Sequence, residues 1–340
     1  MGSSENITVK GSVRVDLLGG TLDLNPINLI LPNVVTLNVA TSLKAVAQIT
    51  EIDYDGVEIV SLDYNTAIKF KSSDFTIEKM RSNFFGNLTF IAYLLDLFSI
   101  HKGIRLELES GSPAGAGLGG SSAMGVTCFK AFCEYKRLPL DRIEAILKVN
   151  SLEARILDSG PAGYQDYYPA LFGGVLGLLP QPGKVTVDQL YNAELKNYLE
   201  SHLTLVYSGE TRLSGINNWE VYKAFFNKDE KVRTGLSKIA DLSNAAYQTI
   251  KTKNLNDLAQ FVASEGDERR KLFPGILTHS MNSLREDLIN QNKNLGLKVC
   301  GAGGGGCFLI THKPNDREFV DQMIAKYQMK KMELIVEKPL

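Results

Sequence analysis

Three dense glycine clusters constrain this chain more than any other feature of its sequence. The clusters lie at residues 19–20, 111–125 and 301–306 and hold many of the 30 glycines. Glycine loses more conformational entropy on folding than any other residue, so a loop this rich in it is used where the backbone approaches a ligand closely. Each cluster also lies beside strand-like sequence, where ligand-binding loops are often placed. The clusters therefore predict a protein whose backbone loops contact a ligand.

The overall composition excludes several classes of protein. The 37 basic and 38 acidic residues give a net charge of −1, which provides no global attraction to nucleic acid or to an anionic membrane. The longest apolar stretches, residues 88–95 and 170–179, are far shorter than the roughly 18 residues that a membrane span needs. The four cysteines have the spacing of neither a disulfide framework nor a zinc site. We therefore expect a cytoplasmic enzyme that binds neither nucleic acid nor membranes.

The hydrophobic patterns predict an α+β protein, and the 340 residues suggest about two domains. Alternating apolar and polar residues at 7–71 indicate a mostly antiparallel sheet, and residues 104–109 form a half-buried strand before the second glycine cluster. The hydrophobic pattern of the sequence changes near residues 190–200, so we expect one domain at 1–195 and a second at 196–340. Helices are expected at 83–100, 121–135, within 215–291 and near 316–327, and further strands at 202–207, 298–300, 307–311 and 332–336.

The central glycine loop (residues 112–120) lies between a strand and a helix and is the most informative segment. The first N–H groups of a helix have no internal acceptor, and the helix dipole adds positive potential, so this arrangement favours an anion such as phosphate. Ser121 and Ser122 follow the loop, where a hydroxyl can coordinate a phosphate-bound Mg²⁺. The segment therefore predicts a site for a nucleotide or another phosphate ester.

Three other interpretations of this loop are possible. A Walker A loop requires lysine, and no lysine lies between Gly111 and Phe129. Residues 115–120 satisfy G-x-G-x-x-G, with Glu134 near the place of a ribose-binding acid, but the incoming strand carries alternating charges and no second strand follows promptly. A dinucleotide-dependent enzyme is therefore a remote alternative. The third interpretation is that the loop is a tight turn that binds no ligand.

Two segments on either side of this loop carry further polar residues. Near the N-terminus a strand leads through Arg14 to a Gly-Gly turn with Thr21 and Asp23, side chains that can hydrogen-bond a polyol, while the arginine can stabilise phosphoryl charge. Asp166 follows Gln165 between a helix and a strand. Taken alone, the N-terminal segment is better explained as an ordinary strand and hairpin corner. Asp166 alone is better explained as a helix cap or a solvated carboxylate.

The C-terminal glycine loop (residues 301–306) joins two apolar strands without a following helix. Six consecutive residues of glycine and alanine contribute little to packing, so a loop against substrate or nucleotide phosphates is the better explanation.

Together these segments resemble the superfamily of galactokinase, homoserine kinase, mevalonate kinase and phosphomevalonate kinase (GHMP kinases). The resemblance rests on the N-terminal Arg and Gly-Gly-Thr motif, Pro-x-Gly-Ala-Gly-Leu-Gly-x-Ser-Ser-Ala, the Gln-Asp loop and the C-terminal glycine motif, and covers residues from about 11 to 310. One departure is Leu22, which separates Thr21 from Asp23. The chain is most similar to heptose-phosphate kinase and fucose kinase-like members. This implies an N-terminal ribosomal-S5-like domain and a C-terminal ferredoxin-like domain with the site between them.

The resemblance also implies a role for individual residues. Asp166 would face the attacking hydroxyl and Arg14 would offset phosphoryl charge. Glu153 and Ser121 would bind Mg²⁺, with Ser122 and Asp158 as the alternatives. The ATP phosphates would contact Pro113, Gly115, Ala116, Gly117, Leu118, Gly119, Gly120, Ser121 and Ser122, and the substrate would contact Gly20, Thr21, Asp23, Gln165, Arg212, Gly303 and Gly304.

The expected function is an ATP- and Mg²⁺-dependent small-molecule kinase that phosphorylates a sugar or sugar phosphate. The resemblance to heptose-7-phosphate 1-kinase-like members implies an anomeric hydroxyl as the acceptor. The alternatives are a mevalonate or isoprenoid-type kinase and a catalytically silent sensor of sugar and ATP. The sequence does not distinguish a homodimer from a monomer.

Overall fold

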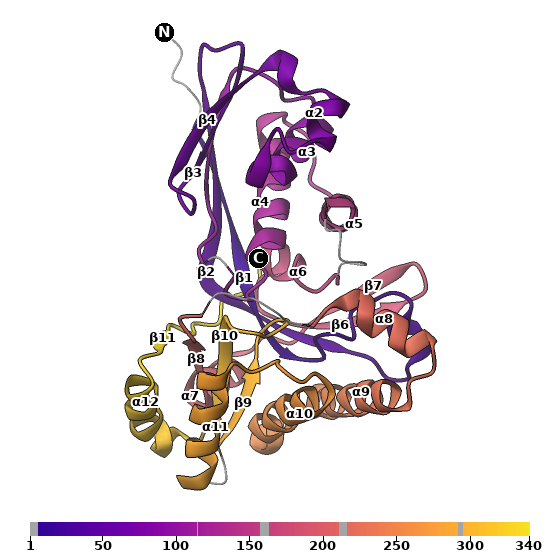
Figure 1. Cartoon of the computed structure of the whole chain (residues 1–340), viewed down its shortest axis with the longest axis vertical. Coiled ribbons are helices and arrows are strands. Elements are labelled where there is room, and N and C mark those ends of the chain that lie inside the picture. The colour runs from indigo at the N-terminus through magenta and orange to yellow at the C-terminus, as the bar shows by residue number, and fades with distance from the viewer. Residues whose placement is uncertain (1–5, 114, 157–162, 211–215, 292–294) are drawn as a thin grey trace.

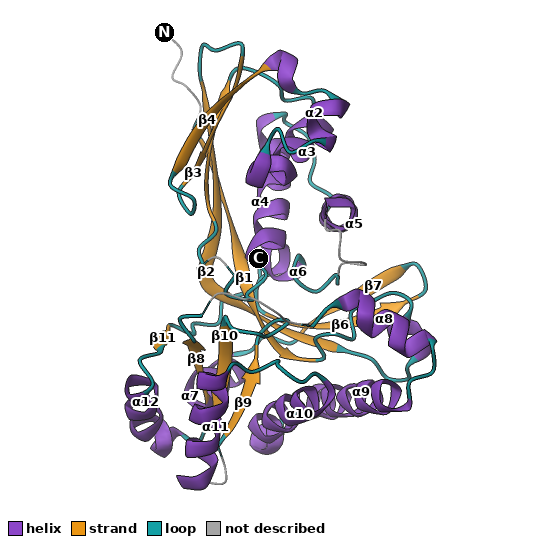
Figure 2. Cartoon of the chain, in the orientation of Figure 1, coloured by secondary structure: helices purple, strands orange, loops and turns teal. Residues whose placement is uncertain are grey.

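The computed structural model describes residues 6–113, 115–156, 163–210, 216–291 and 295–340. The molecule is elongated, with two lobes that meet at a narrow waist (Figure 1). One lobe holds most of the first half of the chain and the other holds the helix-rich second half, and each contains a sheet with helices packed against it (Figure 2).

A seven-stranded sheet forms the framework of the first lobe and extends through the waist. Its order is β4-β3-β5-β2-β6-β7, with β1 paired to β2, and the pairs are antiparallel except for the parallel pair β3-β5. The alternating sequence therefore predicted a mostly antiparallel sheet correctly. The strands are β1 (Ile7–Leu18), β2 (Thr36–Glu51), β3 (Gly56–Ser61), β4 (Thr66–Lys71), β5 (Ile104–Glu109), β6 (Val175–Gln181) and β7 (Lys184–Gln189).

Helices cover one face of this sheet. The helix α4 (Gly120–Tyr135) packs against β1 and β2, and nearly all its residues from Ser122 to Cys133 are buried. It begins directly after the central glycine loop, so packing of α4 fixes the position of that loop. The other helical segments of this part are α1 (Ile27–Ile30), η1 (Ser72–Asp74), α2 (Ile77–Arg81), η2 (Gly86–Leu88), α3 (Thr89–Leu97), α5 (Arg142–Ile156) and α6 (Tyr168–Phe172).

The second lobe contains a four-stranded antiparallel sheet of order β11-β8-β10-β9. Its strands are β8 (Leu203–Tyr207), β9 (Gly296–Val299), β10 (Cys307–Thr311) and β11 (Lys330–Met332). The hairpin of β9 and β10 carries the C-terminal glycine loop at its end. The helical segments are α7 (Ala193–His202), α8 (Asn218–Phe226), α9 (Glu230–Lys251), η3 (Leu255–Asp257), α10 (Leu258–Leu272), α11 (His279–Gln291), η4 (Pro314–Asp316) and α12 (Arg317–Lys326).

The two hydrophobic cores exchange segments across the waist. Leu22, Ile27 and Val34, which follow β1, belong to the core of the second lobe. The end of the chain runs the other way: Val336 pairs with Thr41 and is part of the core of the first lobe. The proposed domain division after residue 195 falls inside α7, immediately before the first strand of the second sheet.

Several expectations about individual elements need correction. The last strand is β11 at Lys330–Met332 rather than residues 332–336, because the chain leaves the second sheet there to return to the first lobe. His202 ends α7 instead of beginning β8. Trp219 on α8 is 44% exposed and stacks on Tyr222. Within the described part of the chain, no helix is long and apolar enough to cross a membrane.

Candidate active site

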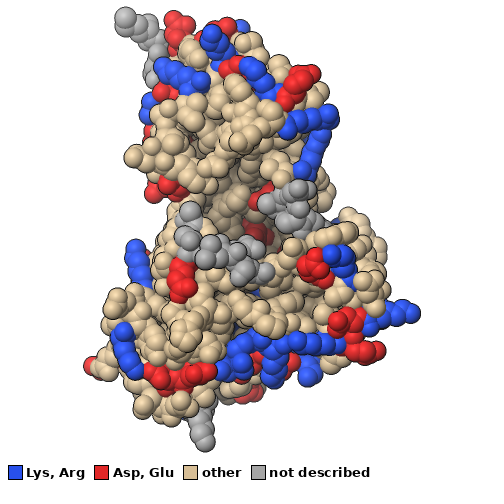
Figure 3. All heavy atoms as spheres, viewed as in Figure 1, with Lys and Arg blue, Asp and Glu red and all other residues tan. Residues whose placement is uncertain are grey.

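A cleft of about 860 Å³ lies at the waist and is lined by residues from both lobes. Its size is within the range of small-molecule sites. The space-filling view shows the hollow between the lobes, with carboxylate side chains inside it (Figure 3). The first lobe contributes an apolar end with Leu88, Phe90, Ile91, Leu108 and Met124. The opposite end is polar and carries Arg14, Asp16, Thr21, Asp23 and Asp166.

The central glycine loop and the start of α4 form the wall between these two ends. Gly115, Gly117 and Gly119 have φ angles of +73°, +73° and +69°, a left-handed conformation that glycine adopts without a steric penalty. Gly119 is the N-cap of α4, so the first N–H groups of this helix open into the cleft region without an intrahelical acceptor. All nine loop and serine residues expected to contact phosphates line the cleft: Pro113, Gly115, Ala116, Gly117, Leu118, Gly119, Gly120, Ser121 and Ser122.

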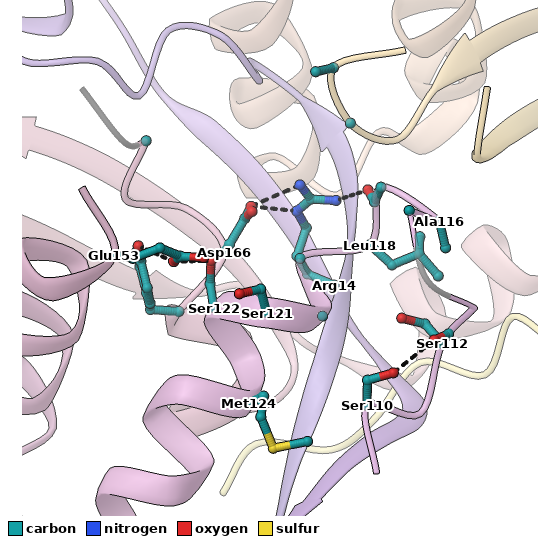
Figure 4. A pocket seen from close by; sticks show the side chains of 18 of the residues that line it. Arg14, Ser110, Ser112, Ala116, Leu118, Ser121, Ser122, Met124, Glu153 and Asp166 are labelled. Carbon is teal, nitrogen blue, oxygen red and sulfur yellow. Dashed lines mark hydrogen bonds and ion pairs between the residues drawn. The ribbon is translucent and has the colours of Figure 1, made fainter. Parts of the chain in front are cut away.

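Arg14, which is buried, and Asp166, which is partly exposed, form an ion pair at the centre of the cleft (Figure 4). Nε and an Nη atom of the guanidinium both lie 2.8 Å from Asp166 Oδ1. A second Nη donates to the carbonyls of Gly117, at 2.5 Å, and Cys300, at 2.7 Å. Burial alone would lower the pKa of Arg14, but the carboxylates of Asp166 and Asp16 outweigh it and raise that pKa. Arg14 therefore holds Asp166 and both glycine loops in place, so most of its donors are bound to protein groups.

Glu153 provides a further carboxylate in the cleft, held by two hydroxyl groups. Its Oε2 accepts hydrogen bonds from Ser122 Oγ and from Tyr167 OH, each at 2.7 Å. Burial raises the pKa of Glu153 despite these bonds, and the nearby Asp166 adds to the increase. A buried carboxylate next to serine hydroxyls and a further carboxylate is a fitting donor set for Mg²⁺, which prefers oxygen ligands and retains several waters. The residues present therefore fit the metal that the sequence predicts.

The structure favours Ser122 over Ser121 as the partner of Glu153. Ser122 is buried and hydrogen-bonded to that carboxylate, whereas Ser121 is exposed and lines the cleft one position earlier on α4. The alternative ligand Asp158 lies outside the described residues.

Thr21, Asp23 and Gln165, three of the residues predicted to contact the substrate, line the cleft. Asp23 Oδ2 accepts a 3.0 Å hydrogen bond from the backbone N–H of Gln165, which fixes Asp23 against the loop that carries Asp166. Burial raises the pKa of Asp23 to about 6, and the negative charges of Asp166 and Asp16 contribute.

The raised pKa of Asp23 predicts a specific pH dependence of stability. The Asp23 carboxyl binds its proton more tightly in the folded state than in the unfolded state. Its stabilising contribution to the free energy of unfolding is therefore fully present below the unfolded pKa of about 4. This contribution is lost as the pH rises through the folded pKa of about 6. Asp23→Asn should therefore be more stable than the wild type at pH 7, by about 2 kcal/mol, and no more stable at pH 4. Denaturant unfolding across this pH range measures the effect.

Asp188 provides the matched control for this experiment. Its pKa is lowered by hydrogen bonds from Tyr247 and Lys251 that outweigh a burial effect of opposite sign, and it lies outside the cleft lining. Asp188→Asn should destabilise the protein more at pH 7 than at pH 4. An Asp23→Asn profile of the same sign as that of Asp188→Asn would contradict the assignment.

The C-terminal glycine loop reaches the cleft at its beginning. Gly301 and Ala302 line the cleft, and a Cβ at Gly301 would lie 2.8 Å from the Gly117 carbonyl, so the two glycine loops pack directly on each other. Gly303 and Gly304, the expected substrate contacts, are instead buried against Ile276, whose carbonyl accepts from Gly304 N–H. The structure does not bring these two residues to the cleft.

Gly20 and Arg212 are the two remaining expected substrate contacts. Gly20 is buried, and a Cβ there would lie 2.0 Å from Asp16 Oδ2, so it allows the turn to pack on that carboxylate and is not part of the cleft lining. Arg212 lies outside the described residues.

Sequence reasoning missed a buried cluster of ionisable residues behind the polar end. Asp16, Glu265, Arg269 and Lys298 are each at most 2% exposed, and their side chains contact one another across the waist. Two of them, Asp16 and Arg269, line the cleft. A signal was present in the sequence, because Lys298 interrupts an apolar strand and Glu265 and Arg269 are four residues apart on one helix.

Comparisons with known proteins connect this geometry to one superfamily. Residues 85–174 match the family model described as "GHMP kinases N terminal domain". A D-glycero-alpha-D-manno-heptose 7-phosphate kinase from Campylobacter jejuni is 24% identical over 95% of this chain and 94% of its own length. An L-fucokinase/L-fucose-1-P guanylyltransferase from Bacteroides fragilis is 25% identical over 92% of this chain. The chain spans about a third of that longer relative, 35% of its length.

The structural comparison agrees with the sequence comparison. A D-glycero-D-manno-heptose 1-phosphate kinase from Bacteroides thetaiotaomicron has the same fold, with a TM-score of 0.75, 20% sequence identity and coverage of 98% of this chain and 96% of that protein. The α+β architecture and the superfamily resemblance expected from the sequence are thereby confirmed. Residues 85–174 of this chain thus match the GHMP kinase N-terminal domain, and the whole chain has the fold of the solved heptose and mevalonate kinases.

Proposed function

We propose that this protein is an ATP-dependent kinase that phosphorylates a hydroxyl group of a sugar or sugar phosphate. The observation that carries the proposal is the position of Asp166 beside the anion-binding start of α4. A Cβ at Gly119, the N-cap of that helix, would lie only 3.0 Å from Asp166 Cβ. A carboxylate next to a phosphate cradle is the arrangement that in-line phosphoryl transfer to an alcohol needs.

The cleft has room for ATP along the central glycine loop. Its phosphates would accept hydrogen bonds from the loop and from the first N–H groups of α4. Its base would occupy the apolar end, between Leu88, Phe90 and Met124. At that end Ser110 N–H donates to Asp63 Oδ2 at 2.9 Å and Ser110 Oγ donates to the carbonyl of Ser112 at 2.8 Å, which orders the entry to the loop.

Mg²⁺ would be held by Glu153 and by Ser122 or Ser121, with waters and phosphate oxygens completing its shell. When bound, the metal neutralises charge on the phosphates. Tyr167 keeps Glu153 oriented through its hydroxyl, which also accepts a hydrogen bond from Asn150 Nδ2 at 3.1 Å.

Asp166 would orient the acceptor hydroxyl and receive its proton as the hydroxyl oxygen bonds to the γ-phosphorus and ADP leaves. Arg14 fixes the carboxylate in the required direction through two contacts to one oxygen. A role for Arg14 in offsetting phosphoryl charge stays a prediction.

A sugar or sugar phosphate fits the acceptor end better than other alcohols. Thr21 and Asp23 place a hydroxyl and a carboxylate there, side chains that hydrogen-bond a polyol. Two relatives are named for fucose and heptose 7-phosphate. We infer attack by an anomeric hydroxyl, in analogy with these relatives. Mevalonate kinases are also among the relatives, and mevalonate is therefore the second candidate substrate.

A substrate panel tests this proposal. ADP formation is measured with ATP, Mg²⁺ and one acceptor at a time. The acceptors are free sugars such as fucose, the phosphates of heptoses and hexoses, and mevalonate. We expect turnover with a sugar or sugar phosphate, and a product whose phosphate NMR coupling places the new ester at the anomeric carbon. Turnover with mevalonate alone would favour the second candidate, and sugar binding without ADP release would indicate a sensor.

A further inference from the structure

The buried charge cluster of Asp16, Glu265, Arg269 and Lys298 joins α10 and β9 of the second lobe to the end of β1. Lys298 Nζ lies 3.1 Å from Asp16 Oδ2 and 3.5 Å from Glu265 Oε1, and it donates to the backbone carbonyl of Asp16 at 2.9 Å. Glu265 Oε2 accepts a 2.7 Å hydrogen bond from Gly19 N–H. The cluster thus fixes both ends of the segment that leads into the N-terminal turn.

Such a cluster is not explained by stability alone. Removing charges from water is costly, and replacing a buried ion pair by apolar residues of similar volume is often neutral or stabilising. Burial raises the pKa of Glu265, which reflects this cost. The cluster lies directly behind the acceptor end of the cleft, and positioning of that end is the advantage that can offset the cost.

Arg269 is the member of the cluster that reaches the cleft. Its two Nη atoms contact Asp16 Oδ2 at 3.4 Å, the carbonyl of Val299 at 3.1 Å and the carbonyl of Gly301 at 2.7 Å. A further contact of 3.4 Å joins Arg269 to Thr21 Oγ1. The planar guanidinium spreads these donors over a fixed fork, which a lysine ammonium cannot reproduce.

Thr21 itself has an unfavourable backbone conformation. Its φ angle is +78°, in the left-handed region that a β-branched residue rarely adopts. Strain of this kind persists where the surroundings impose it, and it is concentrated at functional sites. Glycine would fit this backbone conformation with less strain. The presence of threonine therefore indicates that the side chain itself has a role at this position.

We propose that Arg269 is a positioning residue for the acceptor, acting through Thr21 and Gly301. The guanidinium holds the strained threonine so that its hydroxyl faces the acceptor, and it holds the start of the C-terminal glycine loop against the central one. The second lobe thereby sets the geometry of a substrate site whose polar groups come mainly from the first. This inference rests on the proposed kinase function.

A double-mutant cycle tests the coupling without any substrate. Arg269→Lys keeps the charge, and Thr21→Val removes only the hydroxyl, so each change deletes the contact between the two side chains. We expect each single variant to lower the melting temperature by roughly 2–4 °C and the double variant to lower it by less than their sum. Strictly additive shifts would show that the two residues do not act together. This readout stands even if no substrate of the panel is phosphorylated.

The same variants then test positioning in the kinase assay. Arg269→Lys and Thr21→Val should each lower kcat/KM for the acceptor about 10- to 100-fold, with KM for ATP changed less than about threefold and no further loss in the double variant. Thr21→Ser, which keeps the hydroxyl, should restore most of the acceptor kcat/KM. Equal losses for ATP and acceptor would identify Arg269 as merely structural.

Two further variants separate strain and local damage from positioning. Thr21→Gly should lower the melting temperature less than Thr21→Val because it removes the left-handed strain, yet it should lower acceptor kcat/KM as Thr21→Val does. Lys271→Ala, which removes an exposed cation from the same helix, should leave both parameters unchanged. A Thr21→Gly protein with normal acceptor kcat/KM would overturn the proposal, whereas a wild type inactive on the entire panel would overturn only the kinase assignment.

Discussion

Asp166→Asn should lower kcat by about 10²- to 10⁴-fold, the range for loss of a group that transfers a proton in the transition state. The amide has the same shape and can still accept a hydrogen bond from Arg14 Nε, so the loop should keep its position. It has no charge to attract the hydroxyl proton. ATP affinity should change only a few fold, because the phosphates are held by backbone groups of the central glycine loop. Single-turnover kinetics and ATP titration distinguish the two parameters.

The same substitution also removes the counter-charge of a buried arginine, so some loss of stability is expected. The kinetic comparison must therefore be made per folded protein, with the unfolding curve of each variant recorded. Asp188→Asn is the matched control, because it removes a paired carboxylate outside the cleft lining. Turnover of Asp166→Asn close to that of Asp188→Asn would show that Asp166 does not take part in the chemistry.

Gly119→Ala should lower kcat/KM by about 10²-fold, the cost of a displacement of the order of 1 Å at a reacting group. Gly119 has a φ angle of +69°, and the added Cβ would lie 3.0 Å from Asp166 Cβ and 3.1 Å from Asp166 Cγ. The methyl group would push the carboxylate away from the phosphate cradle, and alanine would be strained in this conformation. Steady-state kinetics with varied ATP and acceptor measures the loss.

A control for the strain is available elsewhere in the chain. Gly183, in the hairpin of β6 and β7, has a φ angle of +78°, and a Cβ there meets no atom within 4 Å. Gly183→Ala should cost a similar amount of stability, about 1 kcal/mol, and leave kcat/KM unchanged. Comparable kinetics for the two alanine variants would mean that Gly119 does not set the position of Asp166.

Local sequence patterns predicted the first lobe well. Period-two alternation located the long strands, and the glycine clusters located the loops, because both signals depend on neighbouring residues. Alternation of this kind is typical of a strand with one side in solvent, but β1 has no such side from Gly11 onward. Arg14 and Asp16 occupy its polar positions, yet they are 4% and 1% exposed because the second lobe covers that face. The polar side of β1 is the site itself, and sequence alone does not tell solvent from a polar cleft.

Contacts between residues far apart in the chain could not be predicted in this way. Arg269 contacts Asp16 across 253 positions, and the pairing depends on how two lobes meet. The choice between Ser121 and Ser122 depends on the phase of α4 relative to Glu153, and a shift of one residue turns the side chain by about 100°. The resemblance to a family indicated which segments matter. Only the assembled structure shows which atom of each segment faces the ligand.

The exchange of core segments across the waist limits how the protein can be divided or moved. A fragment ending near residue 195 would expose Leu22, Ile27 and Val34 to water, and the remaining fragment would carry Val336 without its partner strand. Neither piece should fold independently, and limited proteolysis at the division should release no stable product. A large hinge rotation between the lobes would separate packed residues in both hydrophobic cores. The cleft must then open and close around substrates by small sliding motions within one cooperative unit.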